Sequence, residues 1–286
     1  MTQPGLIEGL PGGHEPLLDA SDPRLERLLA HDASGLHTLL QGPRAHKLGI
    51  AFEALILWGL EQGLGYKCLA RDIQIQDGKR TMGALDFVLK APDGAIEHWE
   101  LAYKLFLQCD DGLEWASWLG PRGRDRLDAK LHKMLTHQLP MSETPQAEAT
   151  LKTLGVDCID RHRLMMQGVL FTPWGKEPQR AVQGHKEAQG RWLRPSQLPD
   201  LVRAHPDTTW VQRHKPLWFG PASALAEHGM SSRQMQGVVE ADELEFPQLW
   251  SQIVDENPSK QRLFFVVKES WGLAPEDRSE ATPDTK

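Results

Sequence analysis

The chain has 286 residues, of which 40% are hydrophobic and 25% are charged, and both values are ordinary for a globular protein. Its formal net charge of −7 argues against a protein that coats nucleic acid, although a local basic surface stays compatible with nucleic-acid binding. The three cysteines are odd in number and widely spaced, which excludes a disulfide framework and leads us to expect a cytoplasmic location.

The sequence carries no signal for secretion or membrane insertion. Residues 1–13 lack the basic region and the apolar core of a signal peptide. The longest apolar stretch, at 50–60, is shorter than a membrane span and contains Glu53. We therefore expect no membrane partner.

We expect one domain with two irregular ends. Residues 1–20 are predicted to form a flexible arm, and the single domain spans 21–272. Within it we place the core at about 45–175 and a C-terminal extension at about 176–272, because no clear linker separates them. The tail at 273–286 is rich in Pro, Glu, Asp, Ser and Thr, a composition that favours disorder.

Two helices are expected near the start of the domain. Asp22 followed by Pro23 is typical of a helix start and predicts a helical N-terminal arm. Residues 45–62 give the strongest helix signal. The apolar residues on its inner face are Ile50, Ile56, Leu57 and Leu60. Glu53 falls on the same face, where it either belongs to a site or lies at the edge of the stripe beside a surface lysine.

Three strands follow this helix. Residues 70–80 alternate between polar and apolar side chains, which predicts the first strand. Residues 83–90 and 97–107 form the next two, and the six residues between them include a proline, an aspartate and a glycine typical of a hairpin turn. Adjacent antiparallel strands would bring Asp86 and Glu100 close together.

Alternation along 97–107 separates two faces of that strand. One face is wholly apolar and is expected to pack on helices; it consists of Trp99, Leu101, Tyr103, Leu105 and Leu107. The opposite face carries Glu100 and Lys104, and Phe106 indicates that this side is also partly covered.

The later elements complete an α/β pattern. A basic helix is expected at 124–138, followed by a strand at 164–174. The pattern weakens after Pro178, and a last strand is expected at 261–271. The order of helix, three strands, helix and strand predicts an α/β sheet core.

The two carboxylates on neighbouring strands make an oxygen site suited to Mg²⁺ or Mn²⁺. Such an ion polarises a phosphate oxygen and lowers the pKa of an attacking water. Lys104 would stabilise the developing charge, and Glu53 would supply a further carboxylate. The alternative is that Asp86 and Glu100 face solvent and that Lys104 pairs with either of them.

The basic helix and the loop before it could line a nucleic-acid site. The residues suited to phosphate contacts are Arg122, Arg124 and Lys130, and Gln138 could reach into the site. A solvated helix face is the alternative. Trp115 and Trp118 either stack on bases or anchor the loop in the core.

Other chemistries find little support. Cys158 and His162 are four residues apart, but no second pair accompanies them, so a zinc site is not expected. The sequence has no GxSxG, P-loop or GxGxxG segment.

At Glu53, Asp86 and Glu100 the sequence resembles the PD-(D/E)XK nuclease superfamily, in which a helix carries a Glu and a following hairpin carries Asp and Glu-X-Lys. More specifically it resembles DUF1853, an uncharacterised bacterial family assigned to that superfamily. The matching stretches are 48–61, 81–90, 98–107 and 118–139, with the GRWLRP and RLFFVV segments downstream. The resemblance implies a restriction-endonuclease-like core, in which helices flank a mixed four-stranded sheet, and metal-dependent cleavage of DNA or RNA.

One position departs from the superfamily pattern. The lysine expected two residues after the Glu is replaced by Ala102, and Lys104 stands four residues after it, roughly 13 Å along an extended strand. Three alternatives stay open for this catalytic lysine: Lys104 leans back toward the carboxylates, Lys130 on the next helix replaces it, or the chain has lost it.

Two hypotheses follow. The first is a nuclease acting on nucleic acid, with DNA the expected form, in which Asp86 and Glu100 bind Mg²⁺ or Mn²⁺, Glu53 assists and Lys104 serves the transition state. The second is a catalytically inactive nuclease-like module that binds nucleic acid or a protein partner.

Overall fold

The structure is a computed structural model that describes residues 47–110, 112–176, 189–214, 218, 227–254 and 257–272. The predicted flexible arm, the helix after Pro23 and the disordered tail lie outside these residues. The first half contains α3 (Leu48–Trp58), η1 (Gly59–Gly63), β1 (Lys67–Asp77), β2 (Arg80–Lys90), β3 (Ile96–Gln108), η2 (Trp115–Ser117), β4 (Trp118–Leu119), α4 (Leu127–Lys133), η3 (Met134–Gln138), η4 (Leu139–Glu143), α5 (Pro145–Thr153) and β5 (Arg161–Pro173). The second half contains β6 (Gly190–Leu193), η5 (Pro195–Gln197), α6 (Leu198–Ala204), β7 (Thr209–Arg213), β8 (Met230–Ser231), α7 (Ser232–Glu240), β9 (Gln248–Val254) and β10 (Asn257–Val266).

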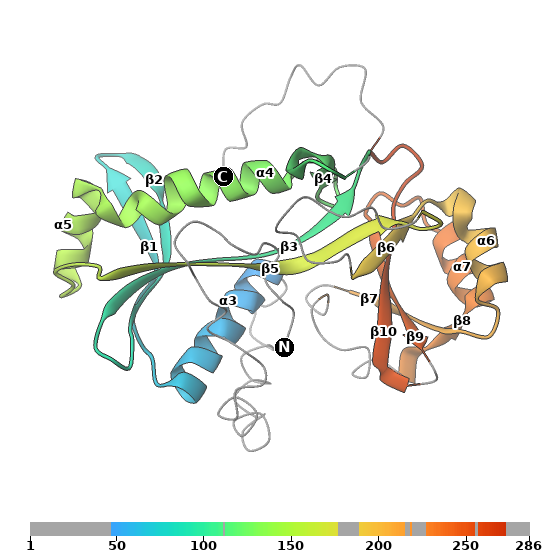
Figure 1. Ribbon diagram of the computed structural model, residues 1–286, viewed down its shortest axis with the longest axis horizontal. Coiled ribbons are helices and arrows are strands. Elements are labelled where there is room, and N and C mark those ends of the chain that lie inside the picture. Colours follow the sequence, from blue (N-terminus) through green and yellow to red (C-terminus); the bar gives the residue numbers. More distant parts are fainter. Residues whose placement is uncertain are drawn as a thin grey trace.

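One mixed sheet of ten strands runs through these elements (Figure 1). Its order is β1-β2-β3-β5-β6-β10-β9-β7-β8, and β4 pairs with β3 off this path. Strand β2 pairs antiparallel with both β1 and β3, whereas β3, β5, β6 and β10 run parallel. The predicted α/β class with a mixed sheet and flanking helices is therefore confirmed, and the sheet is larger than the four strands that the resemblance implies.

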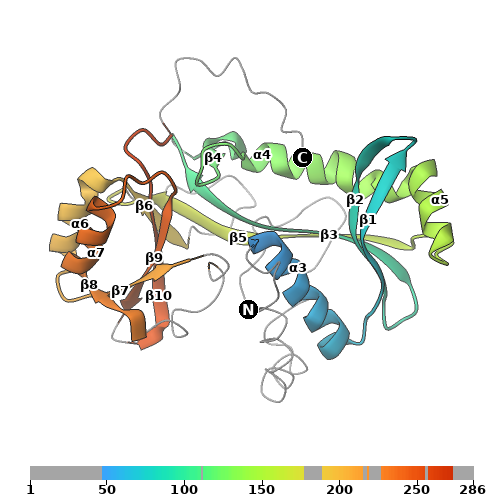
Figure 2. The same cartoon turned by 180° about the vertical axis from the view of Figure 1, so that it is seen from behind.

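The two faces of β3 pack against different helices, as alternation predicted. Leu101 and Tyr103 join the α3 residues Phe52 and Ile56 in one apolar cluster. Phe106, on the opposite face, belongs to a cluster formed with α4. Figures 1 and 2 show α3 and α4 on opposite sides of β3 and β5.

The second half of the chain continues the same sheet. Strands β6 and β10 join it to β5, and α6 and α7 cover the sheet at that end (Figure 2). Trp210 and Trp250 are fully buried beneath these helices, among leucines, valines and methionines. The strand predicted at 261–271 corresponds to β10, which ends earlier, at Val266.

Turn residues set the hairpin that positions the site. Gly94, in the turn between β2 and β3, has a φ of 92°, a value that glycine adopts readily. The Asp93 side chain accepts a hydrogen bond from the backbone N–H of Ala95, and Ala91 N–H donates to the carbonyl of Ala95.

Two predicted helices differ in detail. The helix predicted at 45–62 is an α-helix that ends at Trp58 and continues as a π-helical turn. The helix predicted at 124–138 begins only at Leu127, because Gly120–Asp125 folds into a tight loop in which Gly120 N–H donates to the Asp125 carbonyl. Within the described part of the chain, no helix is long and apolar enough to cross a membrane.

Candidate active site at a fork in the sheet

The site lies where strands β2 and β3 separate. Their pairing runs from Lys90 opposite Ile96 to Phe87 opposite Trp99 and goes no further. Beyond that pair β2 stays with β1, while β3 stays with β5. Asp86 and Glu100 are the first residues past the last pair, so they stand at the mouth of a fork.

The two carboxylates take over the hydrogen bonds that the ladder would have made. Asp86 Oδ2 accepts a hydrogen bond of 2.8 Å from the backbone N–H of Leu101. Glu100 Oε1 lies 3.4 Å from the backbone nitrogen of Asp86. The predicted proximity of Asp86 and Glu100 is thus confirmed, and the alternative in which both face solvent is wrong for Glu100, which is 0% exposed.

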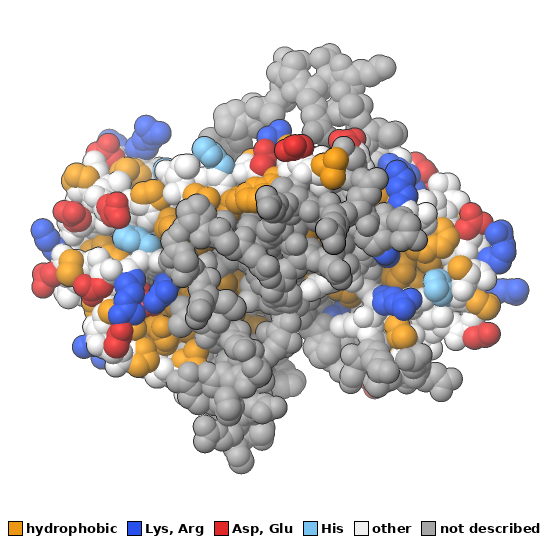
Figure 3. All heavy atoms as spheres, viewed as in Figure 1, with side chains coloured by type: hydrophobic (Ala, Val, Ile, Leu, Met, Phe, Trp, Pro, Cys, Tyr) orange, Lys and Arg blue, Asp and Glu red, His pale blue; other side chains and the backbone are white. Residues whose placement is uncertain are grey.

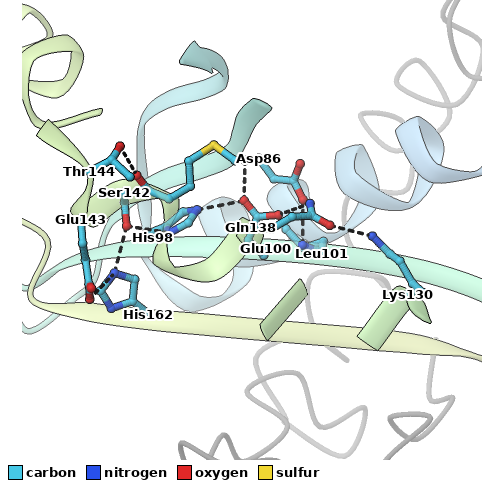
Figure 4. Close-up of polar contacts among 11 residues, drawn as sticks. Asp86, His98, Glu100, Leu101, Lys130, Gln138, Ser142, Glu143, Thr144 and His162 are labelled. Atoms are coloured by element: carbon cyan, nitrogen blue, oxygen red, sulfur yellow. Dashed lines mark hydrogen bonds and ion pairs between the residues drawn. The ribbon is translucent and has the colours of Figure 1, made fainter. Parts of the chain in front are cut away.

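A glutamine and a histidine hold Glu100 in place (Figure 4). Gln138 Nε2 donates to Glu100 Oε2 at 2.7 Å, and His98 Nε2 lies 3.0 Å from Glu100 Oε1. His98 is itself fully buried, with its Nδ1 3.0 Å from Ser142 Oγ. Ser142 Oγ in turn lies 2.9 Å from His162 Nε2, so a hydrogen-bonded chain leads away from Glu100.

When Glu100 is ionised and the His98 ring carries a single proton, one direction of donation satisfies every member of this chain. Glu100 then accepts from the Nε2–H of His98, which leaves Nδ1 of His98 as an acceptor for the Ser142 hydroxyl. The Ser142 oxygen accepts from Nε2–H of His162. The chain therefore fixes the His98 tautomer and holds Glu100 in one orientation. Ser142 is 3% exposed, so it is not open to a substrate as a nucleophile would have to be.

Glu53 lies on α3, across the sheet from α4, and it is near enough to Asp86 and Glu100 for their charges to act on it. Burial raises the pKa of Glu53 to about 7, and the charges of Asp86, Asp72 and Glu100 add to the shift, against a smaller opposing effect of Lys130. The alternative of a surface lysine beside Glu53 finds no support, since Glu53 has no ion pair among the described residues.

The same repulsion acts on Asp86. Burial raises its pKa to about 6, followed in size by the charge of Glu100. The hydrogen bond from Leu101 and the charges of Lys130 and His98 act in the opposite direction. The charges of Asp86 and Glu100 therefore disfavour the ionised form of Glu53, and the charge of Glu100 disfavours that of Asp86.

The two candidate lysines occupy different positions. Lys130 Nζ donates to Gln138 Oε1 at 3.0 Å, and Gln138 bonds Glu100, so Lys130 is one side chain away from the carboxylates. Burial lowers the pKa of Lys130, and the charge of Lys104 lowers it further. Lys104 Nζ forms an ion pair of 3.0 Å with Asp125, and both of its predicted partners, Asp86 and Glu100, are ruled out as the residue it pairs with.

A pocket of about 810 Å³ opens beside the fork. Glu53, Lys104 and Lys130 line it together with the loop residues Arg122 and Arg124. Because α4 begins at Leu127, Arg124, which was predicted to lie in the helix, joins Arg122 in the loop before it. Trp118 is buried in the core, with its indole N–H bonded to the Gly112 carbonyl, which confirms an anchoring role over base stacking.

The donor set suits a hard divalent cation in chemistry and charge. Carboxylate oxygens are the ligands that Mg²⁺ and Mn²⁺ prefer, and mutual repulsion leaves negative charge for an ion to neutralise. Glu100 keeps a free lone-pair direction on Oε2, and the structure gives Asp86 Oδ1 no hydrogen bond. Among the described residues, no three His, Cys, Asp or Glu side chains are grouped closely enough in their present rotamers to hold an ion. The same holds for the pair Cys158 and His162.

A family model described as "Domain of unknown function (DUF1853)" matches residues 14–266. The chain belongs to the DUF1853 family. No curated protein and no solved structure matches it.

Sequence reasoning missed three members of the site in this DUF1853 protein. His98 had a local signal, because it stands two residues before Glu100 on the same face of β3. Ser142 and His162 had none, since they come from η4 and β5 and reach His98 only through the packing of the sheet.

Proposed function

We propose that this DUF1853 protein is a metal-dependent nuclease that hydrolyses phosphodiester bonds in nucleic acid, with DNA the expected substrate. The observation that carries the proposal is the contact of Asp86 with Glu100 at the fork, with Glu53 near enough for both of their charges to raise its pKa. None of the three has an ion pair with a lysine or arginine among the described residues. Buried carboxylates cost free energy unless a cation or a proton compensates them, and at neutral pH a divalent ion does so best.

The order of elements supports a PD-(D/E)XK core. Helix α3, the antiparallel strands β1, β2 and β3, helix α4 and the parallel strand β5 follow one another in the order that the sequence resemblance implies. Within this order Glu53 lies on the helix, and Asp86 and Glu100 lie on the second and third strands, as in the superfamily pattern.

Asp86 and Glu100, assisted by Glu53, would hold the ion, and when bound it would polarise a phosphate oxygen and lower the pKa of an attacking water. In the reaction the water oxygen bonds to phosphorus as the bond from phosphorus to the leaving sugar oxygen breaks. Glu53, with a pKa of about 7, is suited to take up the proton of the water near neutral pH.

We assign the lysine role to Lys130 in place of Lys104. Lys130 is half-buried, lines the pocket with Glu53 and is linked to Glu100 through Gln138. Its ammonium group would stabilise negative charge that develops on the phosphate. Lys104 is engaged by Asp125 and would contribute to substrate binding along the pocket.

A second candidate function is a catalytically inactive module that binds nucleic acid. The observation that favours it is the absence of any three-ligand group among the described residues, together with the hydrogen bonds that occupy both oxygens of Glu100. Such a module would keep the basic pocket and lack a response to metal.

Incubation of the purified protein with single-stranded, duplex and branched substrates, with Mg²⁺, Mn²⁺ or EDTA, separates the two. We expect cleavage that depends on the ion, that Asp86→Asn lowers by at least about 100-fold, and that Asp200→Asn leaves unchanged. Asp200 is a matched control because it pairs with Arg203 on the exposed face of α6, away from the pocket. Intact substrates in every condition, with binding retained, would support the inactive module, and cleavage by Asp86→Asn at the wild-type rate would place the activity elsewhere.

A further inference from the structure

The pocket beside the fork has a second wall, built by the C-terminal strands. Besides α3, β3 and the loop before α4, its lining includes Arg213 at the end of β7 and Phe246 and Pro247 before β9. More than a hundred residues separate these wall positions from Glu100 in the sequence. A ligand in this pocket therefore lies within reach of both halves of the chain.

Both walls carry positive charge. Lys104, Lys130, Arg122 and Arg124 come from the first wall and Arg213 from the second, against the acidic residues Glu53, Asp125 and Asp242. The face drawn in Figure 3 mixes basic, acidic and apolar side chains, whereas the pocket lining holds five lysines and arginines against three acidic residues. A local excess of lysine and arginine in a concave site attracts a polyanion in spite of a net charge of −7.

An exposed aromatic ring joins the two walls. The guanidinium carbon of Arg122 lies 4.8 Å from the centre of the Phe246 ring, and Phe246 is 53% exposed, although large apolar side chains are usually covered. A smaller pocket of about 290 Å³ adjoins the first at this pair and continues to Lys268 and Trp271. A planar cation on an open ring is the surface on which an unpaired base stacks.

We propose that the C-terminal strands form one wall of a groove for a single-stranded nucleic acid. Its bases would stack at the Arg122–Phe246 pair, and its phosphates would lie along the cations from Lys130 to Lys268. This inference rests on the proposed function, since it names the form of substrate that the same site takes. A duplex keeps its bases paired and stacked inside, so it has no base to place on Phe246.

The test is equilibrium binding in EDTA, which prevents metal-dependent cleavage. The probes are a fluorescein-labelled oligothymidine and a blunt duplex of equal length, each measured over a series of salt concentrations. We expect the wild type to bind the oligothymidine more tightly than the duplex. Phe246→Ala should weaken oligothymidine binding by roughly 5- to 150-fold without changing the salt dependence, and Phe246→Trp should restore it.

The phosphate contacts are tested by a different readout. Lys268→Ala and Arg124→Ala should each lower the slope of the logarithm of the binding constant against the logarithm of salt by about 0.7, the value for one contact to a single strand. The matched controls are Leu154→Ala, an exposed apolar residue outside both pockets, and Arg203→Ala, an exposed arginine on α6. Neither control should change affinity or slope.

Three outcomes would overturn the groove: tighter binding of the duplex, wild-type affinity in Phe246→Ala, or unchanged salt slopes in both basic variants. The outcome for the nuclease is separate. Wild-type protein that binds as expected and cleaves nothing with Mg²⁺ or Mn²⁺ contradicts the proposed function and leaves the groove standing. Metal-dependent cleavage that Phe246→Ala retains, with unchanged binding, contradicts the groove and leaves the nuclease standing.

Discussion

Glu97 and Glu100 stand three residues apart on β3, and both are fully buried, yet their surroundings differ. Glu97 accepts hydrogen bonds from Arg161, Arg163 and the indole N–H of Trp99, so two guanidinium groups neutralise its charge. Glu100, on the opposite face, accepts from a histidine and a glutamine and has Asp86 beside it.

The two glutamates thus differ in how the fold compensates a buried negative charge. A buried carboxylate that is paired and fully hydrogen-bonded is compensated within the fold and needs no further partner. A buried carboxylate beside two others, with no ion pair to a lysine or arginine, still favours binding of a cation. The comparison predicts opposite behaviour for the two groups when either is altered.

Removal of the cations around Glu97 should give the largest loss of stability. The double variant Arg161→Met/Arg163→Met leaves a buried charge without compensation, and we expect it to lower the free energy of unfolding by about 3–5 kcal/mol. Urea denaturation measures this, and Arg203→Met, on the surface of α6, is the control. A loss below about 1 kcal/mol would mean that Glu97 is compensated in another way.

Asp86→Asn should separate activity from stability. The variant keeps an acceptor for the Leu101 N–H and removes the repulsion from Glu100 and Glu53. We expect the free energy of unfolding at neutral pH to stay equal or rise by about 1 kcal/mol, while cleavage falls by at least about 100-fold. Parallel denaturation and cleavage assays measure both quantities. Destabilisation comparable to that of the double arginine variant would make Asp86 a structural residue.

The raised pKa values of Asp86 and Glu53 should make the free energy of unfolding depend on pH. In the folded protein the pKa values of Asp86 and Glu53 are raised to about 6 and about 7, whereas both carboxyls titrate near about 4 when unfolded. The unfolded state therefore loses these protons first as pH rises. The contribution of these two carboxyls to the free energy of unfolding is therefore greatest below about pH 4. It decreases as the pH rises from about 4 to about 7.

We expect this loss to be about 1–2 kcal/mol, after a discount for the partial exposure of Glu53 to solvent. Denaturation of wild type and Asp86→Asn over this window gives a difference curve that reports Asp86 together with its effect on Glu53. Excess Mg²⁺ should offset the loss above about pH 7, because it binds the ionised form. A wild-type protein that gains stability relative to Asp86→Asn as pH rises would contradict the raised pKa.

The smallest effect is expected at Lys104. Its ion pair with Asp125 is exposed, with 34% and 60% of the two side chains accessible, so Lys104→Ala should cost less than about 1 kcal/mol of stability. Lys130→Ala should reduce cleavage by about 100-fold because it removes a charge next to the carboxylates, whereas Lys104→Ala should reduce it by less than about 10-fold. Single-turnover rates with Mg²⁺ compare the two, and the reverse order would return the lysine role to Lys104.

Local patterns in the sequence were enough to predict the strands β1, β2 and β3 and the proximity of Asp86 to Glu100. Alternation of side chains and a short hairpin turn are local properties, so the apolar row from Trp99 to Leu107 and the meeting of the two carboxylates could be inferred directly. The start of α4 was placed three residues too early, because the loop at Gly120–Asp125 is closed by backbone hydrogen bonds that residue types do not reveal.

The surroundings of these carboxylates, in contrast, follow from the packing of the whole molecule. The separation of β2 from β3, the choice of Lys130 beside Glu100, the chain through Ser142 to His162 and the second wall at Phe246 all depend on contacts between residues far apart in the sequence. The physical reason is that burial and charge compensation depend on the whole packed sheet and its helices, whereas the alternation of polar and apolar side chains is a property of each strand's own sequence.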